Sequence, residues 1–196
     1  MRRTKINFIC LLISFCMCSY FAAAQNVSAT GFMLYQKNGY LFAAGPKGEV
    51  QISTVINDTL PISINNEVYY VANNRSAIIV YNLNDASSHD LLKNAANEDY
   101  TFKDKIVNMI FSKATNKLFF STVSNKDAHN YVTWSYDMGT KKLGSYKDGI
   151  LESIDEQGMQ VINFYGADYK GKYKLKNIYA ADGTLMQSSV KGYGAY

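Results

Sequence analysis

The sequence predicts an all-β protein made of antiparallel, blade-like meanders. From Gly31 onward, short runs rich in Tyr, Phe, Val and Ile are separated by Asn-Gly, Asp-Gly, Asn-Asn and Gly-Pro pairs. Aromatic and β-branched runs between such pairs are typical of strands joined by tight turns. A second observation is that helical spacing is nearly absent, and a third is a loose internal repeat. Together they favour strands throughout the chain.

The expected strands follow this alternation of apolar runs and turn residues. One segment, 87–100, breaks the pattern, because Leu91, Leu92 and Ala95 have helical spacing. Its length is marginal for a helix, so a helical turn and an irregular loop both remain open. We expect strands at 32–36, 40–44, 49–55, 60–64, 67–72, 77–83, 105–112, 117–123, 131–137, 142–146, 150–155, 159–166, 173–180 and 184–190.

The repeat consists of a turn residue followed by an apolar strand and then by a second strand. Segments 66–71, 116–121 and 158–163 share this opening, and Asn38 begins a shorter copy. The spacing of the later copies approaches the roughly 40–50 residues of a four-stranded propeller blade. The repeat therefore predicts several similar sheets along the chain.

Residues 131–146 carry the clearest resemblance to a known family. The run from Trp134 through Tyr136, Asp137 and Gly139 resembles a blade of exported bacterial β-propellers of the TolB-like, six-bladed kind, and 66–92 is similar. The resemblance covers residues 60–190. It implies a small or partial propeller with a binding or scaffolding role, and it carries over no catalytic residue. A β-sandwich or a calycin-like barrel is the alternative, because tight turns and period-2 strands fit those folds equally.

The first 24 residues predict a signal peptide. Arg2, Arg3 and Lys5 precede an apolar run at 6–21, which is shorter than the ~20 residues of a membrane-spanning helix, and small residues precede Gln25. We expect cleavage after Ala24 and export of 25–196 as a single all-β domain to the periplasm or beyond. All three cysteines lie in the segment to be removed. The mature chain therefore has no thiol for a disulfide, a nucleophile or a metal.

Charge excludes further classes of partner. Three of the four net positive charges belong to Arg2, Arg3 and Lys5, which leaves +1 on the rest of the chain, and Arg75 is the only arginine there. Recognition of nucleic acid is therefore not expected. No second apolar stretch is long enough to span a membrane. We expect no cofactor and no metal, and the partner to be an envelope protein or a glycan.

Titratable side chains suggest weak candidates for chemistry. Asp85 and His89 share a polar loop, which we interpret mainly as solvated turn structure and secondarily as a ligand site. Glu152, Asp155 and Glu156 supply carboxylates of the kind that glycoside hydrolases pair, although spacing alone does not set their separation. An envelope hydrolase using the His89 loop or these acids is thus one alternative function. A structural subunit of a surface assembly, joined through open strand edges, is another.

Aromatic side chains are the best indication of binding. Alternation along 131–137 places Trp134 and Tyr136 on the face opposite Thr133. Most rings on predicted strands belong to the core, and exposed ones stack on sugars and peptides. We expect a ligand patch from Trp134, Tyr136, Tyr165 and Tyr169. The sequence therefore predicts an exported, non-enzymatic binding or scaffold domain of the bacterial cell envelope.

Overall fold

A computed structural model describes residues 32–46, 48–53, 59–72, 75–95, 104–126, 130–165 and 173–192. The chain divides into two compact units, Met1–Thr54 and Val55–Tyr196. Residues 1–24 lie outside the described part, so the signal peptide stays a prediction, as does the single domain over 25–196. Among the described residues no helix has the length and apolarity of a membrane span.

The described part of the first unit is one antiparallel sheet, called sheet A. It contains β1 (Met33–Lys37), β2 (Tyr40–Gly45) and β3 (Gly48–Ser53) in that order. Asn38 and Gly39 both have positive φ, at 52° and 81°, which gives the two-residue hairpin turn that matches the twist of the flanking strands. This turn sets the register, in which Lys37 pairs with Tyr40.

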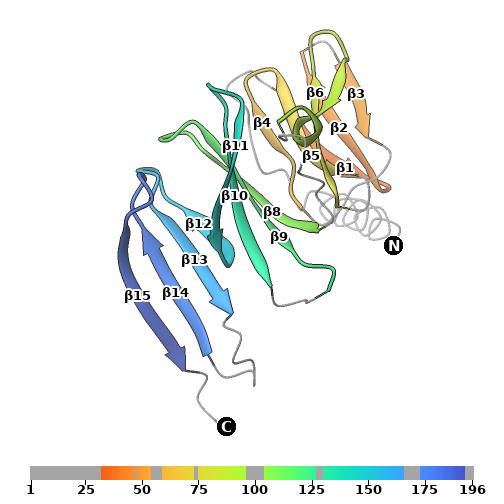
Figure 1. Ribbon diagram of the computed structural model, residues 1–196. Helices are drawn as coiled ribbons and strands as arrows, with labels where there is room; N and C mark the ends of the chain where they lie inside the picture. The colour runs from red at the N-terminus through yellow and green to blue at the C-terminus, as the bar shows by residue number, and fades with distance from the viewer. Residues whose placement is uncertain are drawn as a thin grey trace, which may run out of the picture. The chain divides into compact units, whose positions relative to one another are not determined.

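The second unit contains three four-stranded antiparallel sheets, each a simple meander (Figure 1). The prediction of an all-β protein made of blade-like meanders is confirmed. Sheet B holds β4 (Ile62–Ile64), β5 (Glu67–Ala72), β6 (Ala77–Asn82) and β7 (Ser88–Asp90); sheet C holds β8 (Lys105–Ser112), β9 (Lys117–Val123), β10 (Tyr131–Asp137) and β11 (Lys142–Asp148); sheet D holds β12 (Ile150–Ile154), β13 (Gln160–Tyr165), β14 (Tyr173–Tyr179) and β15 (Leu185–Gly192).

The segment 87–100, for which a helical turn and an irregular loop were both open, contains two short elements in its described part. Strand β7 was not predicted, because three polar residues carry no alternation. It is followed by helix α2 (Leu91–Ala95), within the segment for which helical spacing was noted. Asp90 begins this helix, since its Oδ1 accepts hydrogen bonds from the backbone N–H of Leu92 (2.9 Å) and Lys93 (3.3 Å).

The sequence repeat corresponds to the second strand of every sheet, namely β2, β5, β9 and β13. The turn that precedes each of these strands contains a residue with positive φ: Asn38 at 52°, Asn65 at 54°, Asn116 at 52° and Gly158 at 86°. Asparagine and glycine tolerate this conformation better than other residues. The first residue of the repeat has this conformation at Asn38, Asn116 and Gly158, and in the copy at 66–71 the preceding Asn65 has it, so these turns are the local cause of the repeated hairpin.

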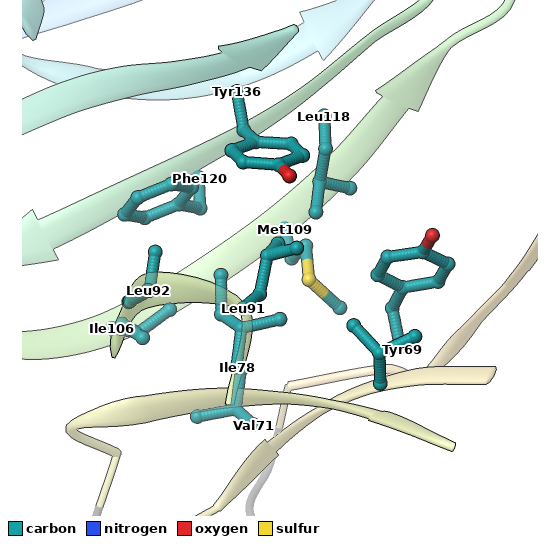
Figure 2. Close-up of a cluster of buried hydrophobic side chains, with 11 residues drawn as sticks. Tyr69, Val71, Ile78, Leu91, Leu92, Ile106, Met109, Leu118, Phe120 and Tyr136 are labelled. Carbon is teal, nitrogen blue, oxygen red and sulfur yellow. The ribbon is translucent and has the colours of Figure 1, made fainter. Parts of the chain in front are cut away.

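Sheet C packs on both of its faces. Its side chains Leu118, Phe120 and Tyr136 meet Ile78 of sheet B in the larger core cluster, and Figure 2 shows Phe120 and Tyr136 over the residues of β5, β6 and α2. Phe119 points the other way, because neighbouring strand residues alternate, and packs with Leu151 and Ile162 of sheet D. Strand β9 is therefore buried on both sides and forms the centre of the second unit.

Polar contacts also join sheets C and D. The buried Ser121 Oγ accepts a hydrogen bond from the backbone N–H of Leu151 (3.0 Å) and lies 3.0 Å from Thr133 Oγ1. Thr133 Oγ1 in turn donates to the carbonyl of Gly149 (2.8 Å). At a bulge in β8, Asn108 accepts from the Ser121 N–H and donates to the Leu151 carbonyl. Ser121 and Asn108 therefore satisfy the N–H and the carbonyl of Leu151 on β12, which in the middle of a sheet would bond to a neighbouring strand.

The turns between third and fourth strands share an aspartate that the sequence repeat did not reveal. The Oδ1 atoms of Asp85, Asp137 and Asp182 accept hydrogen bonds from the N–H groups of Ser87 (2.9 Å), Thr140 (2.8 Å) and Thr184 (2.8 Å). Hydrogen bonds with the side chain and backbone of Ser87 lower the pKa of Asp85 below the usual 3.8, and bonds with the backbone and side chains of Thr140 and Thr184 do the same for Asp137 and Asp182. The shared feature of these turns is therefore an aspartate cap.

Acid is therefore expected to destabilise the protein through these turns. A carboxyl group whose pKa is lower in the folded state stabilises the fold above its unfolded pKa, and this contribution is lost as the pH falls through the folded pKa. The melting temperature should stay level from pH 7 to about 5 and fall below about pH 4. Asp137→Asn keeps an acceptor oxygen without titrating, so its fall should be smaller. An identical acid-induced fall in Asp137→Asn would contradict this role.

Candidate functional site

Sheet A displays a cluster of rings on one of its faces. Cross-strand pairing places Tyr35 opposite Phe42 and Lys37 opposite Tyr40, so these side chains share a face. The Tyr35 and Phe42 rings stack with centroids 5.5 Å apart at 15°, and Tyr40 meets Phe42 edge-on at 6.5 Å. Tyr40 is 38% exposed and Met33, on the same face, 45%. We call Met33, Tyr35, Tyr40 and Phe42 the aromatic face of sheet A.

A carboxylate from the third strand orients the first ring. The Tyr35 hydroxyl donates a hydrogen bond to Glu49 Oε2 on β3. This bond raises the pKa of the Tyr35 hydroxyl, because it favours the protonated phenol, and the nearby negative charge adds to the effect. The site therefore combines apolar ring surface with hydrogen-bonding groups at its margin. That combination suits ligands with both apolar and hydroxyl or amide surface.

The sequence contained a signal for this cluster. A two-residue Asn-Gly turn fixes the register of its hairpin, so residues 35 and 42 must pair if 37 and 40 do. The aromatic residues considered as ligands all lay further along the chain. Applying the register rule to Asn38 and Gly39 would have placed the three rings on one face.

The predicted patch around Trp134 has a different character. Tyr136 is only 6% exposed and belongs to the core between sheets B and C, where burial raises the pKa of its hydroxyl. Trp134 is half-buried, and its Nε1–H donates to Thr122 Oγ1 (3.0 Å). The side chain of Tyr165 and all of Tyr169 lie outside the described residues. Packing is therefore the described role of Tyr136 and Trp134, and a ligand patch from these four residues stays a prediction.

The polar loop with Asp85 and His89, interpreted mainly as turn structure and secondarily as a ligand site, contains a turn capped by Asp85. Asp85 holds the backbone of Ser87, and His89 lies exposed on β7 opposite Val80. In the described part of the chain, no three acidic, histidine or cysteine side chains form a group suited to a metal ion. A ligand role for Asp85 and His89 stays a prediction.

The acids considered for hydrolysis have separate structural contacts. Glu152 accepts a hydrogen bond from Asn163 Nδ2 (2.6 Å) and forms an ion pair with Lys176 (3.4 Å). Asp155 instead caps the turn before β13, accepting from the N–H groups of Gln157 (2.9 Å) and Met159 (2.7 Å). These contacts give Glu152 and Asp155 a role in holding sheet D together, and a catalytic role for Glu152, Asp155 and Glu156 stays a prediction.

Comparison with known proteins gives a likeness of fold. No family's sequence profile matches the chain, and no curated protein sequence matches it. Among solved structures, TolB from Acinetobacter baumannii aligns with a TM-score of 0.53 at 14% identity, over 82% of this chain and 40% of that one. A puromycin-hydrolyzing peptidase of Mycobacterium tuberculosis aligns with a TM-score of 0.56 at 7% identity, over 85% and 31%. Dipeptidyl peptidase 4 of Porphyromonas gingivalis aligns at 0.52 and 10%, over 82% and 31%.

This chain spans less than half the length of each of these structures, and identities this low compare folds alone. The resemblance first seen between residues 60 and 190 is thereby confirmed at the level of the fold. The protein has an all-β, β-propeller-like fold of blade-like antiparallel sheets, similar to that of TolB.

Proposed function

We propose that this protein is an exported, non-enzymatic binding or scaffold domain of the bacterial cell envelope, which recognises a protein or a glycan. The observation that carries the proposal is the aromatic face of sheet A, where Tyr35, Tyr40 and Phe42 form one ordered cluster with Tyr40 more than a third exposed. Exposed large apolar side chains that gather in one place, rather than occurring singly, mark interaction sites.

The geometry of the cluster favours binding because its rings are already ordered. Tyr35 is held by Phe42 and by the hydrogen bond to Glu49, so little side-chain entropy remains to be lost when a ligand covers it. Tyrosine contributes apolar area together with a hydroxyl, which explains its frequency at binding hot spots. A preorganised surface of this kind is suited to recognition.

The contacts of the candidate acids support binding over hydrolysis. Asp85 and Asp155, which the hydrolytic alternative would use, cap turns, and Glu152 is engaged by Asn163 and Lys176. The fold neighbours include both TolB and peptidases, and the likeness to the peptidases covers 31% of their chains. Fold alone does not transfer an activity, so the proposal rests on the site.

Truncating the exposed ring should weaken binding with little loss of stability. For Tyr40→Ala we expect roughly tenfold weaker affinity, about 1.4 kcal/mol, for the ligand found by screening peptidoglycan fragments, oligosaccharides and purified envelope proteins. Calorimetry on the purified protein measures the affinity, and thermal unfolding checks the fold. Met186→Ala, an exposed site on sheet D, is the matched control. Equal affinities of Tyr40→Ala and the parent for every ligand found would reject the aromatic face as the site.

Export is tested separately. Cells that express the full chain should contain it in the periplasmic or extracellular fraction, with an N-terminus at Gln25. Recovery of an uncleaved chain from the cytoplasm would contradict the assignment of residues 1–24 as a signal peptide.

A further inference from the structure

Sheet A differs from the other sheets at its last position. Sheets B, C and D each have four strands in meander order, whereas the described part of sheet A has three. Strand β3 pairs with β2, and no other described strand pairs with it. In each of the other sheets this position of the third strand is covered by a fourth strand: β7 on β6, β11 on β10 and β15 on β14.

The exposure of Val50 on the third strand agrees with this difference, whereas Ile52, further along the same strand, is 9% exposed. In sheet A, Leu34, Ala43 and Val50 form one cross-strand row on the buried face. Leu34 and Ala43 are 2% and 1% exposed, but Val50, at the β3 end of the row, is 46% exposed. The third strand of sheet B shows the opposite, since Val80 lies beside β7 and is only 2% exposed. An apolar row that is buried on two strands and open on the third lacks a neighbour at its end.

Chain length agrees with this comparison. The link from β3 to β4 consists of residues 54–61. The stretch between the third strand and the next sheet is longer elsewhere, namely 83–104 after β6 and 138–149 after β10, and in both cases it contains the fourth strand. Of sheets A, B and C, sheet A is therefore followed by the shortest link in which a fourth strand could form.

We propose that the open edge of β3, over Glu49, Val50, Gln51 and Ile52, accepts an extended segment of a partner protein as its fourth strand. This inference deepens the proposed function, because it makes the partner a protein and names the mode of recognition. Strand addition draws affinity from backbone hydrogen bonds and specificity from alternate side chains. The exposed fraction of Val50 is the apolar surface that the added strand covers.

The register defines the chemistry of that segment. The residue beside Val50 enters the buried row and must be apolar, because its neighbours there are Leu34 and Ala43. The residues on either side of it face Glu49 and Gln51, which lie on the aromatic face. A lysine or arginine beside Glu49 forms a favourable cross-strand charge pair. The partner segment is therefore extended, with an apolar residue between a basic and a polar one.

The test uses the purified protein expressed with its own N-terminal segment, and a synthetic peptide of alternating lysine or threonine and valine. Hydrogen exchange of β3 is measured by mass spectrometry with and without millimolar peptide. We expect slower hydrogen exchange in β3 when the peptide is present. The control is the same peptide N-methylated at alternate residues, which lacks the backbone N–H groups that would donate to β3 and should therefore have no effect. Unchanged exchange in β3, or equal protection by the N-methylated peptide, overturns the proposal.

Two variants separate this edge from the rest of the surface. Val50→Lys places a charge in the apolar row, the device by which natural edge strands avoid pairing, and should weaken peptide binding roughly tenfold or more. Met186→Lys puts the same charge on β15, 62% exposed, and should leave binding unchanged. Equal binding by both variants overturns the proposal, as does protection of β3 that rises with protein concentration alone, which identifies a second copy as the occupant. Weaker ligand binding by Tyr40→Ala together with unchanged peptide protection in Val50→Lys would overturn the edge proposal and leave the proposed function standing, so the two failures are distinguishable.

Discussion

Replacing Phe120 by alanine is expected to lower the free energy of unfolding by about 3–5 kcal/mol. The side chain is fully buried in the cluster that sheets B and C share, among Leu91, Ile106 and Met109 (Figure 2). The substitution removes the transfer free energy of the ring and leaves a cavity that these neighbours cannot fill completely. Denaturant unfolding followed by tryptophan fluorescence measures the change, since Trp134 packs against the same cluster.

The matched control is Phe120→Leu, which keeps most of the apolar volume and should cost less than about 1.5 kcal/mol. Because 1 kcal/mol shifts the melting temperature of a domain of this size by roughly 2–4 °C, the two variants are easily separated. A Phe120→Ala cost below about 1 kcal/mol would mean that sheets B and C do not share a close-packed core.

The second large effect is expected from Gly149→Ala, at the link between sheets C and D. Gly149 has φ of 115°, and a Cβ there would lie 2.6 Å from the carbonyl oxygen of Asn163 and 2.8 Å from Ile162 Cγ2. Its own backbone donates to the Tyr131 carbonyl (2.7 Å) and accepts from Thr133 Oγ1. The local backbone is held by these bonds and cannot move away freely. We expect a loss of at least about 2 kcal/mol from strain and steric overlap together.

Two other glycines separate these causes. Gly39 has φ of 81° but nothing within 4 Å of an added Cβ, so Gly39→Ala should show the backbone strain alone, about 1 kcal/mol. Gly144 has ordinary backbone conformation and only the distant Ser135 Oγ at 3.7 Å, so Gly144→Ala should be close to neutral. If Gly149→Ala costs no more free energy of unfolding than Gly39→Ala, Gly149 does not lie as close to Asn163 and Ile162 of β13 as the structure shows.

Local sequence determined the strands and their grouping. Strands β5, β8, β9 and β10 coincide with the predicted ranges, because alternation and turn residues specify a strand through neighbours in the chain. The repeat identified the second strand of each sheet for the same reason, since the left-handed conformation of Asn38, Asn65 and Asn116 is a local property. Strand β7 escaped prediction because three polar residues pair with β6 only once the hairpin has formed.

Only the tertiary structure decided which side chains are exposed and free to contact a ligand, and which are buried. Tyr40 and Tyr136 both lie on alternating aromatic strands, yet Tyr40 is exposed on sheet A and Tyr136 is buried between sheets B and C. Alternation states which face a side chain occupies, but the neighbour of that face comes from residues distant in the chain. The same reason applies to Glu152, whose partners Asn163 and Lys176 lie on the next two strands. It also applies to Val50, whose exposure depends on a fourth strand that sheets B, C and D have and the described part of sheet A does not.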